Sequence, residues 1–214
     1  MPSRFFITGT DTGIGKTLVS ALLCAALDAI YWKPIQTGTR EDSDRDTVMQ
    51  LAEIGRERTL DEAYRFAPPV SPHLAARLAG VRIDFHRIKL AKPPQLPKGA
   101  NLIAEGAGGA LVPINERQFT TDLMRHLRLP VLLVARTTLG TINHTLLSVV
   151  ALRAARLDLR GVILSGKPNR ENLRAIEHYG DVEVVGSVPL LKKINRGALL
   201  RVYRQNFNRR ALEQ

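Results

Sequence analysis

Cysteine is almost absent from this sequence, and no long apolar run opens it. The single cysteine, Cys24, lies in the run LVSALLCAAL, so one chain can form neither a disulfide nor a cysteine-based metal site. We expect Cys24 to be a small buried side chain on a helix. The first residues, MPSRFFITGT, carry one basic residue and reach glycine after a few apolar positions, unlike a signal peptide or a membrane span. The sequence therefore predicts a cytoplasmic protein with no membrane partner.

Acidic residues are outnumbered, because 31 Lys and Arg stand against 20 Asp and Glu, a formal net charge of +11. Clustered basic residues can bind nucleic acid by neutralising its phosphates. Here the excess is weighted to residues 192–210, without an interleaved aromatic platform or a zinc-finger, homeodomain or RRM signature. We expect a solvated helical face that attracts anionic ligands, and no nucleic-acid partner.

The hydrophobic pattern predicts an α/β fold. A chain of 214 residues with 44% apolar and 24% charged positions is typical of a globular protein, with one domain over residues 1–214. Short apolar segments alternate with stretches of helical length, and parallel strands need helical crossovers, so we expect a mainly parallel sheet with helices on both faces. The predicted strands are residues 4–8, 29–34, 101–105, 130–135, 160–165 and 182–188. The predicted helices are residues 16–28, 46–54, 72–78, 121–127, 142–156 and 171–179.

The segment GTDTGIGKT, residues 9–17, stands where the first predicted strand meets a helix. Glycines admit a ligand close to the backbone, and inward N–H groups with a helix N-terminus suit a polyphosphate. In such a P-loop, Lys16 reaches the β- and γ-phosphates and the Thr17 hydroxyl coordinates Mg²⁺. Five residues separate Gly9 from Gly15 instead of the usual four, so Thr10 takes the standard first position. A glycine turn with an incidental GKT is the alternative. The residues predicted to bind ATP here are Asp11, Thr12, Gly13, Ile14, Gly15, Lys16 and Thr17.

Two more motifs follow predicted strands, KPIQTG from Lys33 and EGAGG from Glu105. Open α/β sheets bind ligands at the carboxyl ends of their strands, so we expect Lys33 to face the same phosphates. Glu105 suits Mg²⁺, which prefers oxygen ligands. Taken singly, such a lysine is more often a surface charge, and such a glutamate could equally cap a turn.

These motifs together resemble the dethiobiotin synthetases. The resemblance rests on the segments GTDTGIGKT, WKPIQTG, Asp46 in the stretch EDSDRD, SPH at 71–73, EGAGG, and LGTINHTLL at 139–147. The match runs in order from the first strand to about residue 165. It implies a homodimeric enzyme of biotin biosynthesis that uses ATP and Mg²⁺ to join CO₂ to 7,8-diaminopelargonic acid. The ureido ring would close through a carbamate and a carbamic-phosphoric anhydride.

The resemblance also implies roles for matching residues. Lys16 and Lys33 would neutralise the transferring phosphoryl group and hold the carbamate, with the hydroxyls of Thr10 and Thr37 as partners. The implied Mg²⁺ ligands are Thr17, Asp46 and Glu105.

Substrate and base recognition follow from the same comparison. The backbone of Gly108 and Gly109 would form the substrate floor. The substrate carboxylate would bind a helix N-terminus of the partner subunit, capped by Thr141 and including Ile142 and Asn143. Family members often have an adenine-binding asparagine where this chain has Ser165, and a glutamate where it has Gly13, so we expect loose base recognition.

Two other functions stay open. A partitioning or assembly ATPase of the same P-loop branch typically has a second lysine early in the loop, in the form KGG-GKT, where residues 10–13 have none. In such an ATPase, the basic C-terminal helix would bind DNA or membrane. The apolar positions of that helix in this sequence instead indicate a face that packs on the core; these positions are Leu199, Leu200, Val202 and Phe207. A nucleotide-binding scaffold without catalysis would not need three converging charged motifs. For His73 and His144 we expect structural hydrogen bonds rather than catalysis.

Overall fold

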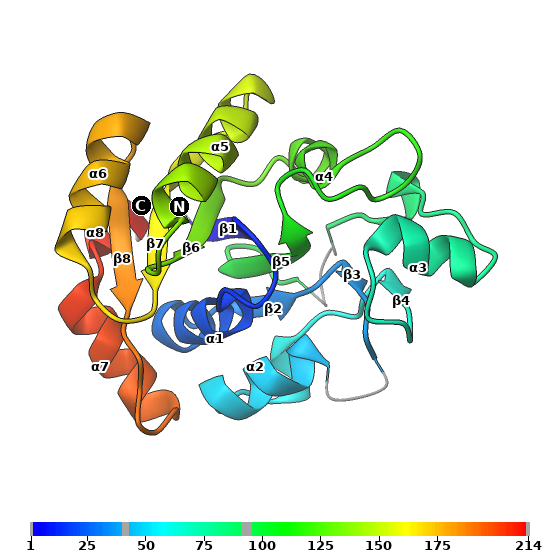
Figure 1. Ribbon diagram of the computed structural model, residues 1–214. Coiled ribbons are helices and arrows are strands. Elements are labelled where there is room, and N and C mark those ends of the chain that lie inside the picture. The colour runs from blue at the N-terminus through cyan, green and yellow to red at the C-terminus, as the bar shows by residue number, and fades with distance from the viewer. Residues whose placement is uncertain (1, 40–42, 91–95, 213–214) are drawn as a thin grey trace.

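The computed structural model describes residues 2–39, 43–90 and 96–212 and shows one α/β domain (Figure 1). Six strands form a parallel sheet in the order β2-β5-β1-β6-β7-β8. Their bounds are β1 Arg4–Gly9, β2 Ile30–Trp32, β5 Leu102–Gly109, β6 Val131–Arg136, β7 Leu159–Ser165 and β8 Val184–Val188. The predicted parallel sheet is thus confirmed.

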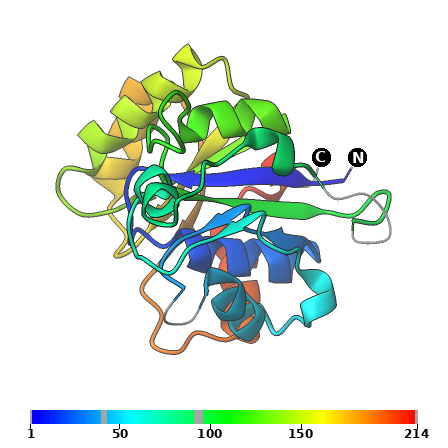
Figure 2. The same ribbon diagram turned by 90° about the vertical axis from the view of Figure 1, so that its right-hand side faces the viewer.

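Helices cover both faces of this sheet, as the view along its edge shows (Figure 2). The helices of one face are α1 Lys16–Leu27, α2 Asp44–Ala52, α7 Arg196–Asn206 and α8 Arg209–Leu212. Those of the other face are α4 Thr120–Leu127, α5 Thr141–Ala154 and α6 Arg170–Gly180. The helix α3 Pro72–Leu78 and a two-stranded sheet of β3 Ile35–Gln36 and β4 Tyr64–Arg65 lie beyond the β2 edge, with 3₁₀ turns at Arg56–Arg58 and Phe85–Arg87.

The strands are apolar on both sides because each side of the sheet packs against helices. Along β1, Phe6 belongs to the core beneath α4 and α5, whereas Phe5 and Ile7 belong to the core beneath α1. Successive side chains of a strand point to opposite faces, so a strand covered on both faces reads as a continuous apolar run. A continuous apolar run is easily recognised, so the strands of this sheet could be predicted from the sequence.

The basic C-terminal helix α7 uses its apolar residues for packing, as predicted. Leu199 is fully buried, and Val202 and Phe207 are buried with it against the sheet. In the described part of the chain, no helix combines the length and apolar character needed to cross a membrane.

The starts of α2 and α5, which bear on the predicted site, differ from the prediction. Helix α2 begins at Asp44, not Asp46, because Ser43 is its N-cap and Asp46 lies at the third helical position of a capping box. Helix α5 begins at Thr141 with Gly140, not Thr141, as N-cap, and the Thr141 hydroxyl donates instead to the carbonyl of Arg136.

The order of the strands brings the sequence motifs together. Strand β1, which leads into the P-loop, lies between β5 and β6, and β2 flanks β5 on its other side. Ile7 pairs with Glu105, and Trp32 pairs with Ala104. Lys33 therefore follows β2 at the level where Glu105 stands on β5, next to the start of the P-loop.

Candidate active site

The P-loop spans the turn between β1 and α1. Gly15, the N-cap of α1, has a φ of 95°, and a Cβ there would lie 2.6 Å from the Ser165 hydroxyl oxygen, so only glycine fits. The Lys16 ammonium folds back over the loop and donates to the Asp11 carbonyl at 2.7 Å. Burial lowers the pKa of Lys16 and outweighs the carboxylate of Glu105, which raises it. The loop therefore holds a buried cation above free helix N–H groups, as an anion site requires.

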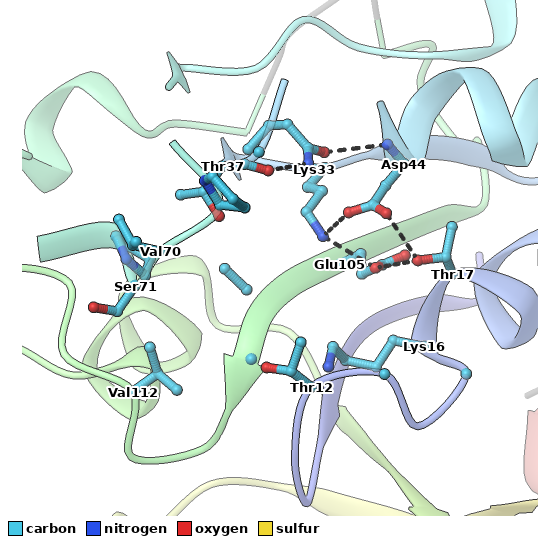
Figure 3. A pocket seen from close by; sticks show the side chains of 18 residues that line it. Thr12, Lys16, Thr17, Lys33, Thr37, Asp44, Val70, Ser71, Glu105 and Val112 are labelled. Atoms are coloured by element: carbon cyan, nitrogen blue, oxygen red, sulfur yellow. Dashed lines mark hydrogen bonds and ion pairs between the residues drawn. The ribbon is translucent and has the colours of Figure 1, made fainter. Parts of the chain in front are cut away.

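Glu105 lies at the centre of a polar cluster on the same edge (Figure 3). Its Oε1 accepts from the Thr17 hydroxyl at 3.0 Å and lies 3.1 Å from the Lys33 ammonium. Its Oε2 accepts from the hydroxyls of Ser20 at 2.7 Å and Tyr31 at 3.1 Å. Glu105 is only 1% exposed, so every one of these partners offsets the cost of burying its charge.

Asp44, rather than Asp46, completes the cluster. The Thr17 hydroxyl donates to Asp44 Oδ1 at 3.1 Å, and Asp44 forms an ion pair with Lys33. Asp46 instead accepts from the backbone and hydroxyl of Ser43 and does not line the cavity. The third position of a capping box faces back to the N-cap, whereas the first position here faces the P-loop. The prediction of Asp46 as a site carboxylate is therefore corrected to Asp44.

The charges of this cluster hold one another in place. Burial lowers the pKa of Lys33, but Glu105 and Asp44 together outweigh burial, and the pKa lies above its ordinary value. Burial raises the pKa of Asp44, yet Lys33 and the Thr17 hydrogen bond bring it below its ordinary value. Burial and Glu105 raise the pKa of Tyr31 well above its ordinary value. Lys33 is thus a buried cation between two carboxylates.

A cavity of about 670 Å³ opens beside this cluster. Of the predicted site residues, those that line it are Thr12, Gly13, Gly15, Lys16, Thr17, Lys33, Thr37, Glu105 and Gly108. The opposite wall comes from the loop before α3 and the turn after β5, including Val70, Ser71 and Val112 (Figure 3). Lys16 and Lys33 thus face one cavity from two different strand ends.

Several predicted residues lie close to the cavity without lining it. Ile14 is buried beneath the P-loop, and Asp11 is exposed on its outside. The Thr10 hydroxyl is buried, with no hydrogen-bond partner among the described residues. Gly109 packs on the P-loop, where a Cβ would lie 3.2 Å from the Gly9 carbonyl oxygen. Ser165 contacts Gly15 from the end of β7.

The residues at the start of α5 are separate from this cavity within one chain. Thr141 is buried, Ile142 half-buried and Asn143 exposed, and none of them lines it. The two histidines of the matching motifs have local partners: His73 Nδ1 lies 3.0 Å from the Ser71 hydroxyl, and His144 Nδ1 lies 3.1 Å from the Arg136 guanidinium.

The oxygen atoms at the cluster suit a hard cation. Thr17 Oγ1, Asp44 Oδ1 and Glu105 Oε1 converge within hydrogen-bond distance, with Asp44 partly open to the cavity. Mg²⁺ is commonly held by one or two carboxylates and by substrate phosphates rather than by an all-protein cage. The described residues contain no group of three His, Cys, Asp or Glu side chains that could hold a metal alone. The donor set therefore fits Mg²⁺ bound together with a nucleotide.

Known proteins share both the sequence and the fold. A family model described as an AAA domain matches residues 3–198. ATP-dependent dethiobiotin synthetase BioD of Agrobacterium fabrum is 48% identical over 208 residues, which cover 97% of this chain and 96% of the relative. The enzyme of the same name from Rhodopseudomonas palustris is 47% identical, covering 97% and 95%. The chain belongs to the ATP-dependent dethiobiotin synthetases.

The fold of these synthetases also occurs in other P-loop ATPases. A ParA family ATPase from Chlorobium tepidum superposes with a TM-score of 0.52 at 10% identity, covering 99% of this chain and 96% of that one. Identity at that level indicates a shared fold alone.

Three polar residues of the cluster around Glu105 escaped the sequence analysis: Asp44, Ser20 and Tyr31. The Ser43-to-Asp46 spacing, that of a capping box, was the available signal for Asp44. Ser20 lies one helical turn after Thr17 and shares a face of α1 with it. Tyr31 lies on β2, two residues before Lys33, which follows the strand.

Proposed function

We propose that this protein is an ATP-dependent dethiobiotin synthetase that closes a ureido ring from 7,8-diaminopelargonic acid and CO₂. The observation that carries the proposal is the position of Lys33, which brings a second buried ammonium to the cavity of the P-loop lysine, Lys16. Phosphoryl transfer depends mainly on positioning and charge stabilisation, and two cations at one cavity can stabilise both a phosphate and a carboxylate-like nucleophile.

The reaction proceeds in three steps. The N7 amine adds to CO₂ and loses a proton, which gives a carbamate. A carbamate oxygen attacks the γ-phosphorus of ATP and displaces ADP, which gives a carbamic-phosphoric anhydride. The N8 amine then attacks the carbamoyl carbon, and phosphate and a proton leave as the ring closes. No side chain acts as a covalent nucleophile.

The chain's own residues bind and orient these groups. Lys16 binds the β- and γ-phosphates, and Lys33 binds the γ-phosphate and the carbamate. The hydroxyls of Thr10 and Thr37 bind the carbamate or the phosphate, and the position of Thr37 in the cavity wall supports its role. The substrate floor is the backbone of Gly108 and Gly109.

Nucleotide and metal share the P-loop edge. Thr17, Asp44 and Glu105 would hold Mg²⁺, which would supply positive charge to the phosphates. The nucleotide residues are Asp11, Thr12, Gly13, Ile14, Gly15, Lys16, Thr17 and, near the base, Ser165.

The active site is shared across a two-fold homodimer. Three apolar side chains are exposed at and beside α5, namely Leu139 at 99%, Leu147 at 61% and Val150 at 64%, which favours a covered interface. In an isologous dimer the start of α5, residues 141–143, faces the partner's cavity and binds the substrate carboxylate through its N–H groups. A heterodimer of Lys16→Ala and Asn143→Glu chains should regain activity, since one site is intact; an inactive heterodimer contradicts sharing.

The function is tested by incubating the protein with 7,8-diaminopelargonate, bicarbonate and MgATP. We expect ADP release that depends on the diamine and formation of dethiobiotin, detected by mass spectrometry. ATP hydrolysis that is independent of the diamine would instead favour a partitioning or assembly ATPase. Because the reaction consumes intracellular ATP, we propose a cytoplasmic location. We also propose that residues 1–214 form a single domain.

A further inference from the structure

The two oxygens of the Glu105 carboxylate have different surroundings. Oε1 faces the cavity side, with Thr17 and Lys33 at 3.0 and 3.1 Å. Oε2 faces the protein interior, where it accepts hydrogen bonds from Ser20 and Tyr31. Ser20 and Tyr31 are both fully buried and do not line the cavity. The carboxylate is therefore held by two hydroxyl donors on the side away from any ligand.

The two donors come from different elements that close around Glu105. Ser20 lies on α1, one turn after Thr17, so both hydroxyls project from the same side of the helix. Tyr31 lies on β2, where it pairs with Ile103 of β5, and its ring packs in the core beneath α1. Lys33 lies two residues after Tyr31, just past the end of β2, and both side chains contact Glu105.

Such an arrangement fixes the rotation of the carboxylate. The terminal torsion of a glutamate is broad, so a carboxylate held on one side only can turn and exchange its oxygens. Two donors on Oε2 remove that freedom and leave Oε1 as the oxygen presented towards Thr17. Partners that orient a metal-binding side chain commonly change metal affinity by about 10- to 100-fold.

We propose that Tyr31 and Ser20 are positioning residues that present Glu105 Oε1 to the Mg²⁺ bound with ATP, and so set the affinity of this site for the metal. The inference rests on the proposed function only in its assignment of Glu105 to the metal. Neither hydroxyl touches substrate. A purely structural role for the same hydrogen bonds would lower stability and leave metal affinity unchanged.

The experiment measures metal binding without turnover. Mn²⁺ is titrated into the full-length protein with a non-hydrolysable ATP analogue, and free Mn²⁺ is followed by electron paramagnetic resonance. We expect Tyr31→Phe and Ser20→Ala each to weaken Mn²⁺ binding by about 10-fold, and the double variant to weaken it further. The matched control is Tyr64→Phe, which removes a buried phenol hydroxyl bonded to the backbone of Asp84, away from the cluster. It should keep wild-type Mn²⁺ affinity, and thermal unfolding checks that every variant is folded.

The outcomes separate this inference from the proposed function. If Glu105→Gln weakens Mn²⁺ binding but Tyr31→Phe, Ser20→Ala and the double variant all stay within twofold of wild type, the positioning role is wrong and the metal assignment stands. If Glu105→Gln itself has no effect, both the metal assignment and the inference are overturned. A failure to form dethiobiotin would change neither result, because Mn²⁺ binding is measured with the nucleotide analogue alone.

Discussion

Asp44 and Asp46 provide a stringent test of the site, because they are two residues apart and the structure gives them different tasks. Asp44 lies at the P-loop edge with Thr17 and Lys33, whereas Asp46 caps its own helix through Ser43. Replacing each by asparagine keeps the shape and removes the charge. Asp44→Asn should therefore affect Mg²⁺, and Asp46→Asn should affect stability.

The expected sizes follow from these contacts. Loss of an orienting partner alone costs about 10- to 100-fold in metal affinity, so removing the charge of a direct ligand should raise the Mg²⁺ concentration for half-maximal activity by at least about 10-fold. Loss of a whole helix cap costs about 1 kcal/mol of unfolding free energy, which for a chain of this size lowers Tm by about 2–4 °C. Asp46→Asn keeps Ser43 as N-cap and an oxygen that can accept from it, so its effect should lie below that range.

The stability effect of Asp46 should also depend on pH. The hydroxyl and N–H of Ser43 hold the pKa of Asp46 below its ordinary value. A carboxylate whose pKa is lower in the folded than in the unfolded state stabilises the fold at pH values above its unfolded pKa of about 3.9. That stabilisation is lost as the pH falls through the folded-state pKa. The Tm difference between wild type and Asp46→Asn should thus be full at pH 7 and shrink below about pH 4.

The assays are Mg²⁺ titrations of diamine-dependent ADP release and thermal denaturation followed by circular dichroism. Each variant serves as the control for the other. The reasoning is refuted if Asp46→Asn raises the Mg²⁺ requirement as much as Asp44→Asn does, or if Asp44→Asn gives a titration that superimposes on wild type.

Three further substitutions test the remaining assignments. Lys16→Ala should lower kcat by at least about 10²-fold, the scale for one electrostatic donor, in steady-state assays; near wild-type turnover would remove Lys16 from the site. Lys33→Gln takes the cation from between buried carboxylates, so it should abolish ring closure and cost about 3–5 kcal/mol of stability in metal-free buffer, with partial recovery when Mg²⁺ and ATP are added. Unchanged activity and Tm would show that the Lys33 charge neither serves the reaction nor stabilises the cluster. Ser165 cannot offer adenine a paired donor and acceptor, so kcat/KM for ATP should exceed that for CTP or GTP by less than about 10³-fold; greater discrimination points to a hydrogen-bonded base pocket elsewhere.

The layers of the fold could be predicted because burial on both faces leaves a strong trace in the sequence. Strands such as Val131–Arg136 are almost uniformly apolar, and helix α3 begins and ends at Pro72 and Leu78, as predicted. Strands β3 and β4 were missed because two residues each are too few to show an alternating pattern.

The site could be predicted only as far as its motifs reach. Lys16 and Thr17 begin α1 after the loop that follows β1, Lys33 follows β2, and Glu105 lies within β5; each belongs to a recognisable motif, and the strand order brings them together. Tyr31 sits in an apolar strand, where a tyrosine is expected to be a packing residue. Its contact with Glu105 depends on β2 pairing with β5, some 70 residues later, and nothing local in the sequence encodes that pairing.

Charge balance links the stability of this site to its proposed chemistry. Lys16 and Lys33 carry two positive charges, and Asp44 and Glu105 carry two negative charges within the same cluster. An unpaired buried charge costs several kcal/mol, and Lys33 is the cation that pairs with the buried Glu105. In the proposed reaction, Asp44 and Glu105 would hold Mg²⁺, and the Lys33 charge would then be available to the carbamate and the γ-phosphate. One side chain thus stabilises the buried glutamate and the reacting anions in turn, which is why Lys33→Gln should damage stability and ring closure together.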